Sequence, residues 1–150
     1  MFFAERKDPN AKVIQQQIRD EANEMIADRK LFEVLMVDRG GKITEGSRSN
    51  VFFVKNDVFY TAPESMVLIG ITRQEVLDCL KVLGLEVVEE AVAAAEIGLF
   101  DAAFITGTSP KVLPVRLVGR QRFQVEASCV KKLMNAYDQL IVNYVRDAKR

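Results

Sequence analysis

Residues 45–54 decide how the chain can fold, and they read Glu45-Gly46-Ser47-Arg48-Ser49-Asn50-Val51-Phe52-Phe53-Val54. The apolar run at 51–54 predicts a buried strand, and residues 58–61 add a second strand across the turn at 55–57, which makes a β-hairpin. Polar side chains directly before a buried strand line a site more readily than a core. We therefore expect residues 45–50 to border a ligand site.

The same kinds of pattern predict the elements on either side of this hairpin. Thr72 fits the N-cap of a helix, with Glu75 as its capping-box partner, and Gly84 fits the C′ position of that helix. A first hairpin over residues 32–44 has Glu45 at its exit. We expect helices over residues 11–29, 73–83, 91–97 and 130–145, and further strands over 32–37, 42–44, 85–89, 102–105, 111–118 and 122–125. Strands linked by both hairpins and helices predict an α/β (α+β) fold, a mixed sheet with helices packed around it.

Composition narrows the possible functions. With 150 residues, 49% of them apolar, the chain can bury one independent core, so residues 1–150 are expected to form a single domain. Lysine plus arginine equals aspartate plus glutamate at 21 each, which argues against nucleic acid or an anionic membrane as a partner and favours a small ligand. No apolar stretch approaches the roughly 20 residues that span a bilayer.

Residue types further restrict the chemistry. The chain has no histidine, which excludes imidazole triads and histidine metal sites, and we expect no metal. Cys79 and Cys129 lie far apart within helical patterns, where a thiol commonly serves as a small buried hydrophobe. Reduced thiols suit a cytoplasmic protein. Catalysis must therefore use lysine, carboxylate, tyrosine, hydroxyl or a cofactor.

Lys12 and Glu45 are the candidate reactive groups. The Lys12 amine stands between Asn10-Ala11 and Val13-Ile14, and a primary amine can form a Schiff base with an aldehyde. A lone lysine is more often a solvated surface charge. The Glu45 carboxylate could accept a hydrogen bond from a protonated pyridine nitrogen, or it could only bond to nearby backbone in its turn.

Two segments rich in small residues are candidates for phosphate binding. Gly70-Ile71-Thr72 places amide N–H groups at the start of a helix, where the helix dipole and unpaired donors favour an anion, although a simple capping box is the alternative. Gly107-Thr108-Ser109-Pro110 follows a strand and would let a ligand approach the backbone closely, although it could be an ordinary loop. Together with Lys12 and Glu45, these segments suggest pyridoxal 5′-phosphate.

The same residues, in the same order, resemble the class IV pyridoxal-phosphate family of branched-chain aminotransferases, D-amino-acid aminotransferases and aminodeoxychorismate lyases. The resemblance runs from Lys12 through residues 44–52 and 70–73 to residues 104–110 and 113–115. It implies the large domain of fold-type IV enzymes, a largely antiparallel pseudo-barrel sheet surrounded by helices. It also implies a homodimer.

By this resemblance, Lys12 holds the cofactor as an internal aldimine and moves the proton, and Glu45 faces the pyridine nitrogen. Ile71, Thr72 and Thr108 would bind the phosphate, and Thr108 and Ser109 would receive the substrate carboxylate. The cofactor contacts that we predict also include residues of the same three segments, namely Ser49, Asn50, Gly70 and Gly107.

The chain departs from the family pattern at two points. Gln17 stands where branched-chain enzymes have a tyrosine five residues after the lysine, and only eleven residues precede Lys12 where the family has a smaller N-terminal domain. We therefore expect the cofactor domain without that small domain. Amino transfer between an amino acid, including branched-chain ones, and a 2-oxo acid leads our hypotheses. Elimination from aminodeoxychorismate to 4-aminobenzoate and pyruvate, and a cofactor-binding domain without turnover, are the alternatives.

Overall fold

A five-stranded sheet forms the centre of the protein. The computed structural model describes residues 2–3 and 16–148. Strand β4 (Asn50–Lys55) pairs antiparallel with β5 (Val58–Thr61) on one side and with β7 (Ala102–Gly107) on the other. Strand β6 (Val87–Glu89) adds parallel to β5, and β8 (Lys111–Pro114) adds antiparallel to β7, so the order is β6-β5-β4-β7-β8.

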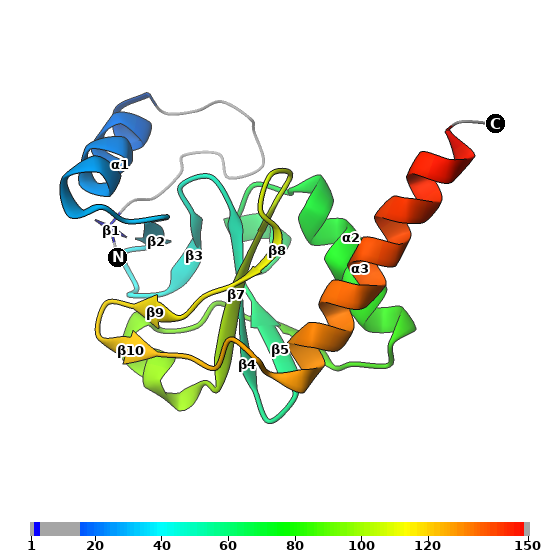
Figure 1. Cartoon of the computed structure of the whole chain (residues 1–150). Helices are drawn as coiled ribbons and strands as arrows, with labels where there is room; N and C mark the ends of the chain where they lie inside the picture. The colour runs from blue at the N-terminus through cyan, green and yellow to red at the C-terminus, as the bar shows by residue number, and fades with distance from the viewer. Residues whose placement is uncertain (1, 4–15, 149–150) are drawn as a thin grey trace.

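Two small sheets lie beside the main one (Figure 1). Strand β1 (Phe2–Phe3) pairs parallel with β2 (Leu35–Val37), which pairs antiparallel with β3 (Ile43–Gly46). Strands β9 (Leu117–Val118) and β10 (Gln121–Arg122) form a separate antiparallel pair. Most pairs are antiparallel, so the prediction of a mixed, largely antiparallel α/β fold is confirmed.

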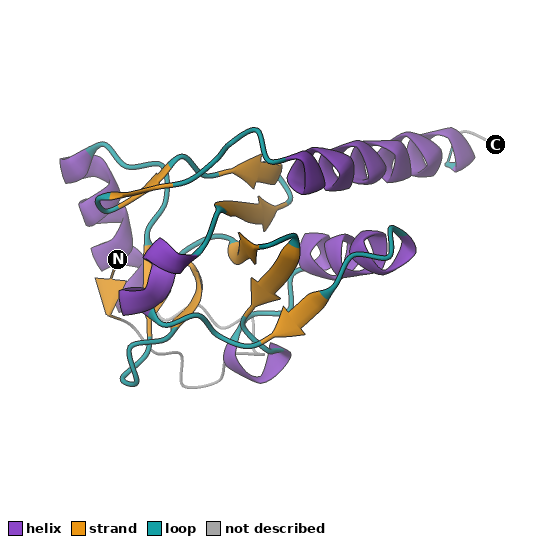
Figure 2. Ribbon diagram, turned by 90° about the horizontal axis from the view of Figure 1, so that it is seen from below, coloured by secondary structure: helices purple, strands orange, loops and turns teal. Residues whose placement is uncertain are grey.

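Within the residues that the structure describes, three α-helices and two short 3₁₀ helices surround these sheets. Helices α2 (Ile71–Val82) and α3 (Ser128–Asp147) pack against each other, whereas α1 (Gln16–Arg29) lies next to the small sheet at the other end of the molecule (Figures 1 and 2). The 3₁₀ helices are η1 (Glu64–Met66) and η2 (Ala94–Leu99). No helix within residues 16–148 is long and apolar enough to cross a membrane.

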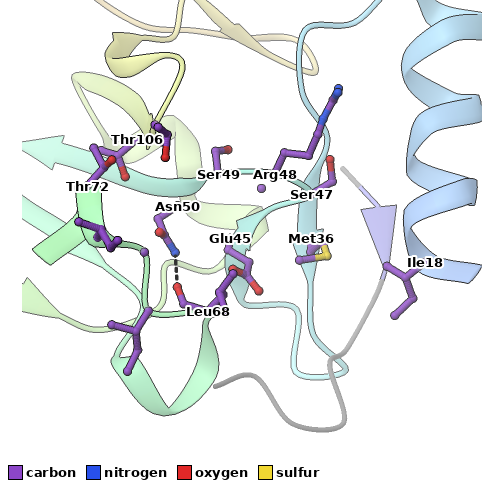
Figure 3. Close-up of a pocket in the computed structure, with 16 residues that line it drawn as sticks. Ile18, Met36, Glu45, Ser47, Arg48, Ser49, Asn50, Leu68, Thr72 and Thr106 are labelled. Atoms are coloured by element: carbon purple, nitrogen blue, oxygen red, sulfur yellow. Dashed lines mark hydrogen bonds between the residues drawn. The ribbon is translucent and has the colours of Figure 1, made fainter. Parts of the chain in front are cut away.

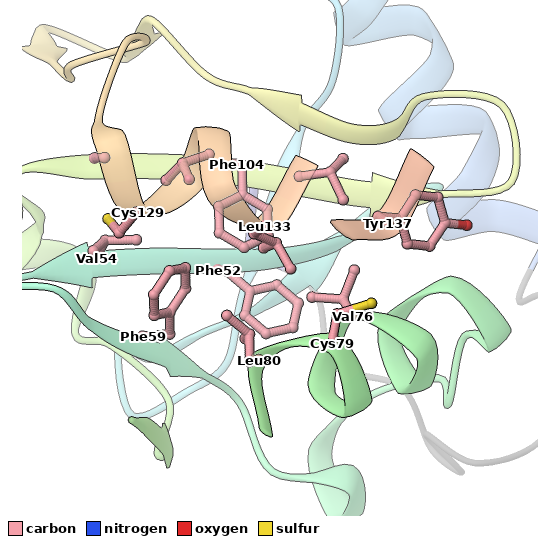
Figure 4. Close-up of a cluster of buried hydrophobic side chains, with 13 residues drawn as sticks. Phe52, Val54, Phe59, Val76, Cys79, Leu80, Phe104, Cys129, Leu133 and Tyr137 are labelled. Atoms are coloured by element: carbon pink, nitrogen blue, oxygen red, sulfur yellow. The ribbon is translucent and has the colours of Figure 1, made fainter. Parts of the chain in front are cut away.

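The apolar run at residues 51–54 is buried on both faces of the main sheet. Alternate side chains of a strand point to opposite faces. Accordingly, Phe52 and Val54 join one core cluster under α2 and α3 (Figure 4). Val51 and Phe53 join a second cluster on the other face. Phe52 stacks on Phe104 of β7 with ring centroids 4.9 Å apart. This double burial fixes the sheet as the middle layer.

The predicted end of α2 is confirmed in detail. Gly84 has a positive φ of 66°, and its N–H donates to the carbonyl of Lys81 while the N–H of Leu85 donates to the carbonyl of Leu80. These two bonds are the Schellman arrangement that satisfies the last carbonyls of a helix. Cys79 and Cys129 are buried free thiols, as predicted.

The predicted start of α2 is wrong. The helix begins at Ile71 with Gly70 as its cap, because the N–H of Gln74 already donates to the Gly70 carbonyl, so Thr72 lies inside the first turn. Glu75 makes no capping box with Thr72; its carboxylate accepts a hydrogen bond of 3.1 Å from the Tyr137 hydroxyl.

Several other boundaries also differ from the prediction. Strand β2 begins only at Leu35, since Phe32 is 70% exposed, and β3 extends to Gly46, so Glu45 lies within a strand rather than at its exit. The helix expected at 91–97 is the 3₁₀ helix η2. The strand expected at 111–118 is divided after Pro114: the N–H of Val115 still donates to the carbonyl of Ala103, but Leu117 and Val118 pair with β10 instead of β7. Strand β10 replaces the strand expected at 122–125, and the predicted helix at 11–29 is described only from residue 16.

Candidate functional site

One cavity brings together the three predicted segments. Its volume is about 400 Å³, which falls within the range of small-molecule sites. Figure 3 shows that the side chains in its wall come from both the main sheet and the small sheet, with α2 closing one side. The lining residues are Ile18, Met36, residues 45–50, residues 68–72 and residues 106–108.

Glu45 and Asn50 both hold the segment that leads into α2. The Glu45 side chain is buried at 2% exposure, and its Oε2 accepts a hydrogen bond of 3.1 Å from the N–H of Leu68. The Asn50 Nδ2 donates to the carbonyl oxygen of the same Leu68 at 3.0 Å. These bonds fix the Glu45 carboxylate in the cavity wall. They also fix Leu68, which lies in the segment that leads into α2.

Glu33 is a residue of the site that the sequence did not reveal. Its Oε1 accepts hydrogen bonds from the N–H of Ser47 at 3.1 Å and from the Ser47 hydroxyl at 2.6 Å. Its Oε2 accepts from the Ser49 hydroxyl at 2.8 Å and from the N–H of Arg48 at 3.3 Å. This half-buried carboxylate thus gathers the donors of residues 47–49, which form one wall of the cavity.

Gly46 allows residues 46–49 to form a tight turn. A Cβ at Gly46 would lie 2.2 Å from the Ser49 Oγ and 3.0 Å from the Glu33 carboxylate, and its N–H donates to the Ser49 carbonyl at 2.7 Å. No other residue type fits without displacing these groups. The small residue in the predicted segment is therefore required by packing around Glu33.

The start of α2 presents backbone donors to the cavity. Its cap, Gly70, makes no side-chain capping bond, and a Cβ there would lie 2.5 Å from the Asn50 Oδ1. The first N–H groups of a helix carry partial positive charge and lack intrahelical partners. Gly70, Ile71 and Thr72 all line the cavity, so this end of it suits an anionic group.

Arg73 holds the first turn of α2 in place through its buried side chain. Its side chain is fully buried, and its NH2 donates to the Ala62 carbonyl at 3.0 Å and to the Glu89 carboxylate at 2.9 Å. Its NH1 lies 3.6 Å from Glu64 Oε1. The start of α2 is therefore fixed to the loop after β5 and to β6.

Tyr137 of α3 holds α2 close to its start. Its hydroxyl bonds to Glu75, one turn along α2 from Thr72. Burial raises the pKa of Tyr137 above its ordinary value; a hydrogen bond with Thr72 opposes the rise, and the neighbouring Glu75 carboxylate adds to it. The hydroxyl therefore stays protonated and remains a donor across the neutral pH range.

The third segment contributes small and hydroxyl residues. Thr106, Gly107 and Thr108 line the cavity, whereas Ser109, in the same turn, does not. The Thr106 Oγ1 is buried and makes no hydrogen bond with any residue that the structure describes. Sequence reasoning missed Thr106 because it continues an apolar strand, where a threonine is an ordinary β-former.

The structure does not test the predicted role of Lys12. Lys12 lies outside the described residues, so its place relative to the cavity stays a prediction. Within the described residues, no group of three or more aspartate, glutamate or cysteine side chains could hold a metal ion.

Comparison with known proteins identifies the family. Residues 3–118 match the family model for amino-transferase class IV, so the chain belongs to the class IV aminotransferase family. The branched-chain-amino-acid aminotransferase of Pseudomonas aeruginosa is 34% identical over 111 residues, which are 73% of this chain and 36% of that protein. The D-alanine aminotransferase of Bacillus licheniformis is 41% identical over 91 residues, 60% of this chain and 32% of that protein.

Solved structures of the family have the same fold. The branched-chain amino acid aminotransferase of Thermobaculum terrenum, in its PLP form, superposes with a TM-score of 0.82 at 29% identity, over 89% of this chain and 45% of that one. A Legionella pneumophila protein whose name proposes a 4-amino-4-deoxychorismate lyase gives 0.80 at 20% identity, over 92% and 54%, which shows the fold alone. The chain spans about a third of the curated relatives and about half of these structures.

Proposed function

We propose that this chain binds pyridoxal 5′-phosphate in the cavity and forms the cofactor-binding part of an aminotransferase. The observation that carries the proposal is the meeting of a buried carboxylate, Glu45, with the start of α2 in one cavity of about 400 Å³. Membership of the class IV aminotransferase family supports it. The PLP form of the Thermobaculum terrenum relative supports the choice of cofactor.

The donor set fits this cofactor. A pyridoxal phosphate needs an anion site for its phosphate and an acidic group for its pyridine nitrogen. The first N–H groups of α2 and the hydroxyls of Thr72 and Thr108 supply donors, and Glu45 supplies the carboxylate. Gly70 and Gly107 leave room for close approach to the backbone.

Each protein group has a definite task in this proposal. When bound, the cofactor supplies an electron-withdrawing ring that stabilises negative charge at the substrate carbon. Glu45 holds the proton on the pyridine nitrogen by accepting its hydrogen bond. Lys12 attaches the cofactor through Nζ and moves the substrate proton. Ser49 and Asn50, in the cavity wall, would contact the cofactor. Thr108, together with Ser109 from the same turn, would receive the substrate carboxylate.

The substrates that we propose are an amino acid and a 2-oxo acid, with branched-chain amino acids as the first choice. The name of the Pseudomonas aeruginosa relative, which matches 73% of this chain, favours that choice. Two copies of the chain are proposed to associate as a homodimer, which light scattering of the purified protein tests. A mass of one chain, near 16.9 kDa, would contradict it.

Borohydride reduction followed by peptide mapping tests the central proposal. The wild-type protein, incubated with pyridoxal phosphate and reduced, should carry the label on Lys12. Lys12→Ala should lose the label and the visible absorbance, whereas Lys132→Ala, at an exposed lysine of α3, should keep both. Label on another lysine in the wild type would refute the assignment.

Substrate assays separate the remaining alternatives. Leucine, isoleucine, valine and D-alanine, each with 2-oxoglutarate, test amino transfer. Aminodeoxychorismate, followed by detection of 4-aminobenzoate and pyruvate, tests the lyase reading, which the fold shared with the Legionella protein makes worth including. Bound cofactor without any half-reaction would support a cofactor-binding domain without turnover and exclude the proposed transfer by this chain alone.

A further inference from the structure

The Thr106 side chain places a buried hydroxyl group in the wall of the cavity. Thr106 is the next to last residue of β7, its exposure is 1%, and its Oγ1 bonds to no residue that the structure describes. Asn50 is opposite it in the β4–β7 register, but the Asn50 amide donates to Leu68 instead. Burying a hydroxyl without a partner costs free energy, so an isosteric apolar residue would be favoured here on stability alone.

The surroundings of this hydroxyl point to an anion. Thr106 and Thr72 both line the cavity, α2 packs on β7, and Figure 3 draws the two side chains at the same end of the site. That end contains the first turn of α2, with its backbone donors and positive dipole. A hydroxyl there can donate its hydrogen to an anionic oxygen that the helix start also binds.

We propose that Thr106 is a binding residue for the phosphate group of the ligand and donates a hydrogen bond from Oγ1 to a phosphate oxygen. This inference rests on the proposed function, because it assumes that the phosphate lies at the start of α2. It adds a residue to the predicted phosphate contacts, which are Ile71, Thr72 and Thr108.

Thr106→Val tests the proposal, because it keeps the shape and removes only the hydroxyl. The dissociation constant for pyridoxal 5′-phosphate, measured by absorbance titration of the full chain, should rise about tenfold, which corresponds to about 1.4 kcal/mol. Affinity for pyridoxal, which has no phosphate, should not change. Thr106→Ser should restore binding. In urea unfolding without ligand, the Thr106→Val midpoint should equal or exceed that of the wild type.

Thr61→Val is the matched control. Thr61 is a threonine buried at 3% exposure whose Oγ1 donates to the Val51 carbonyl at 2.8 Å, and it does not line the cavity. Its loss should lower the unfolding midpoint and leave the affinity for pyridoxal phosphate unchanged. The two substitutions are thus expected to have opposite patterns.

Two results would overturn the role of Thr106. One is an affinity of Thr106→Val for pyridoxal phosphate equal to that of the wild type. The other is destabilisation of the free protein as large as that of Thr61→Val, which would mean that the hydroxyl has a structural partner. If the wild type does not bind pyridoxal phosphate, the proposed function fails. Protection of the wild type, but not of Thr106→Val, from unfolding by inorganic phosphate then decides the inference by itself.

Discussion

Gly70 is a single position where the absence of a side chain shapes the cavity. Its φ of −75° is open to any residue, so a substitution there meets no backbone strain. The obstacle is Asn50, whose Oδ1 would lie 2.5 Å from an added Cβ. We expect Gly70→Ala to displace Asn50, to break its hydrogen bond to Leu68 and to lower the free energy of unfolding by about 1 kcal/mol. Because Asn50, Leu68 and Gly70 all line the cavity, pyridoxal phosphate binding should weaken as well. Absorbance titration measures this.

Gly84→Ala is the control for that experiment. Gly84 has nothing within 4 Å of an added Cβ, but its φ of 66° is unfavourable for alanine. The substitution should lower the free energy of unfolding by about 1 kcal/mol and leave cofactor affinity unchanged. Equal affinities of Gly70→Ala and the wild type would show that Asn50 can move without consequence for the site.

Cys129 gives the protein a defined dependence on alkaline pH. Burial raises the pKa of its thiol from 9.0 to about 11, with the hydrogen bond to Asp57 as a further cause. Above pH 9 the unfolded thiol ionises while the folded thiol stays protonated, so the unfolded state gains relative stability until about pH 11. The free energy of unfolding should fall over this range, and less steeply in Cys129→Ala. Parallel pH profiles of the two proteins in urea unfolding would contradict the shift.

At the scale of elements, the connection from β3 to β4 depends on a carboxylate outside it. Glu33→Gln keeps the shape of the side chain but removes its charge and puts an N–H₂ group in the place of one acceptor. Hydrogen bonds to a charged group are worth about 1.5–3 kcal/mol each, so we expect the free energy of unfolding to fall by about 2 kcal/mol. Hydrogen exchange at the amides of Ser47 and Arg48 should become faster, and cofactor affinity should fall.

Asp101→Asn is the control for Glu33→Gln, because it removes the charge of another carboxylate that accepts a backbone hydrogen bond but lies away from the cavity. Asp101 Oδ2 accepts a hydrogen bond of 2.8 Å from the N–H of Asn56 in the exposed β4–β5 turn, and Asp101 does not line the cavity. Exchange at Asn56 should become faster without any change in cofactor binding. Unchanged exchange at Ser47 and Arg48 in Glu33→Gln would remove Glu33 from the organisation of the site.

The elements differ in how far the sequence could predict them. The β4–β5 hairpin and the end of α2 follow from local signals, an apolar run around a short turn and a glycine with positive φ. The start of α2 could not be found in this way, because Thr72 and Glu75 match a capping box while the tertiary partner of Glu75 is Tyr137 on α3. This partner lies 62 residues further along the chain, so no local signal in the sequence predicts that Glu75 bonds to it.

For the molecule as a whole, the sequence predicts those cavity residues whose type stands out between apolar runs. It does not predict those that reach the cavity only through tertiary packing. Residues 45–50, 70–72 and 107–108, apart from Ile71, are small or polar residues between apolar runs, and the structure brings them together. Glu33 looks like any surface carboxylate until Ser47 and Ser49 are folded onto it. Met36 and Ile18, which also line the cavity, resemble ordinary core residues in the sequence.

Because the cavity joins the small sheet, the main sheet and α2, ligand binding should stabilise the protein as one unit. At a pyridoxal phosphate concentration of 100 times its dissociation constant, mass action adds about 2.7 kcal/mol to the free energy of unfolding. For a chain of this size, that corresponds to a rise of roughly 5–10 °C in the melting temperature. Calorimetry should show a single transition that moves as a whole. Two transitions, of which only one moves with ligand, would mean that the cavity walls belong to separately folding parts, against the prediction of a single domain.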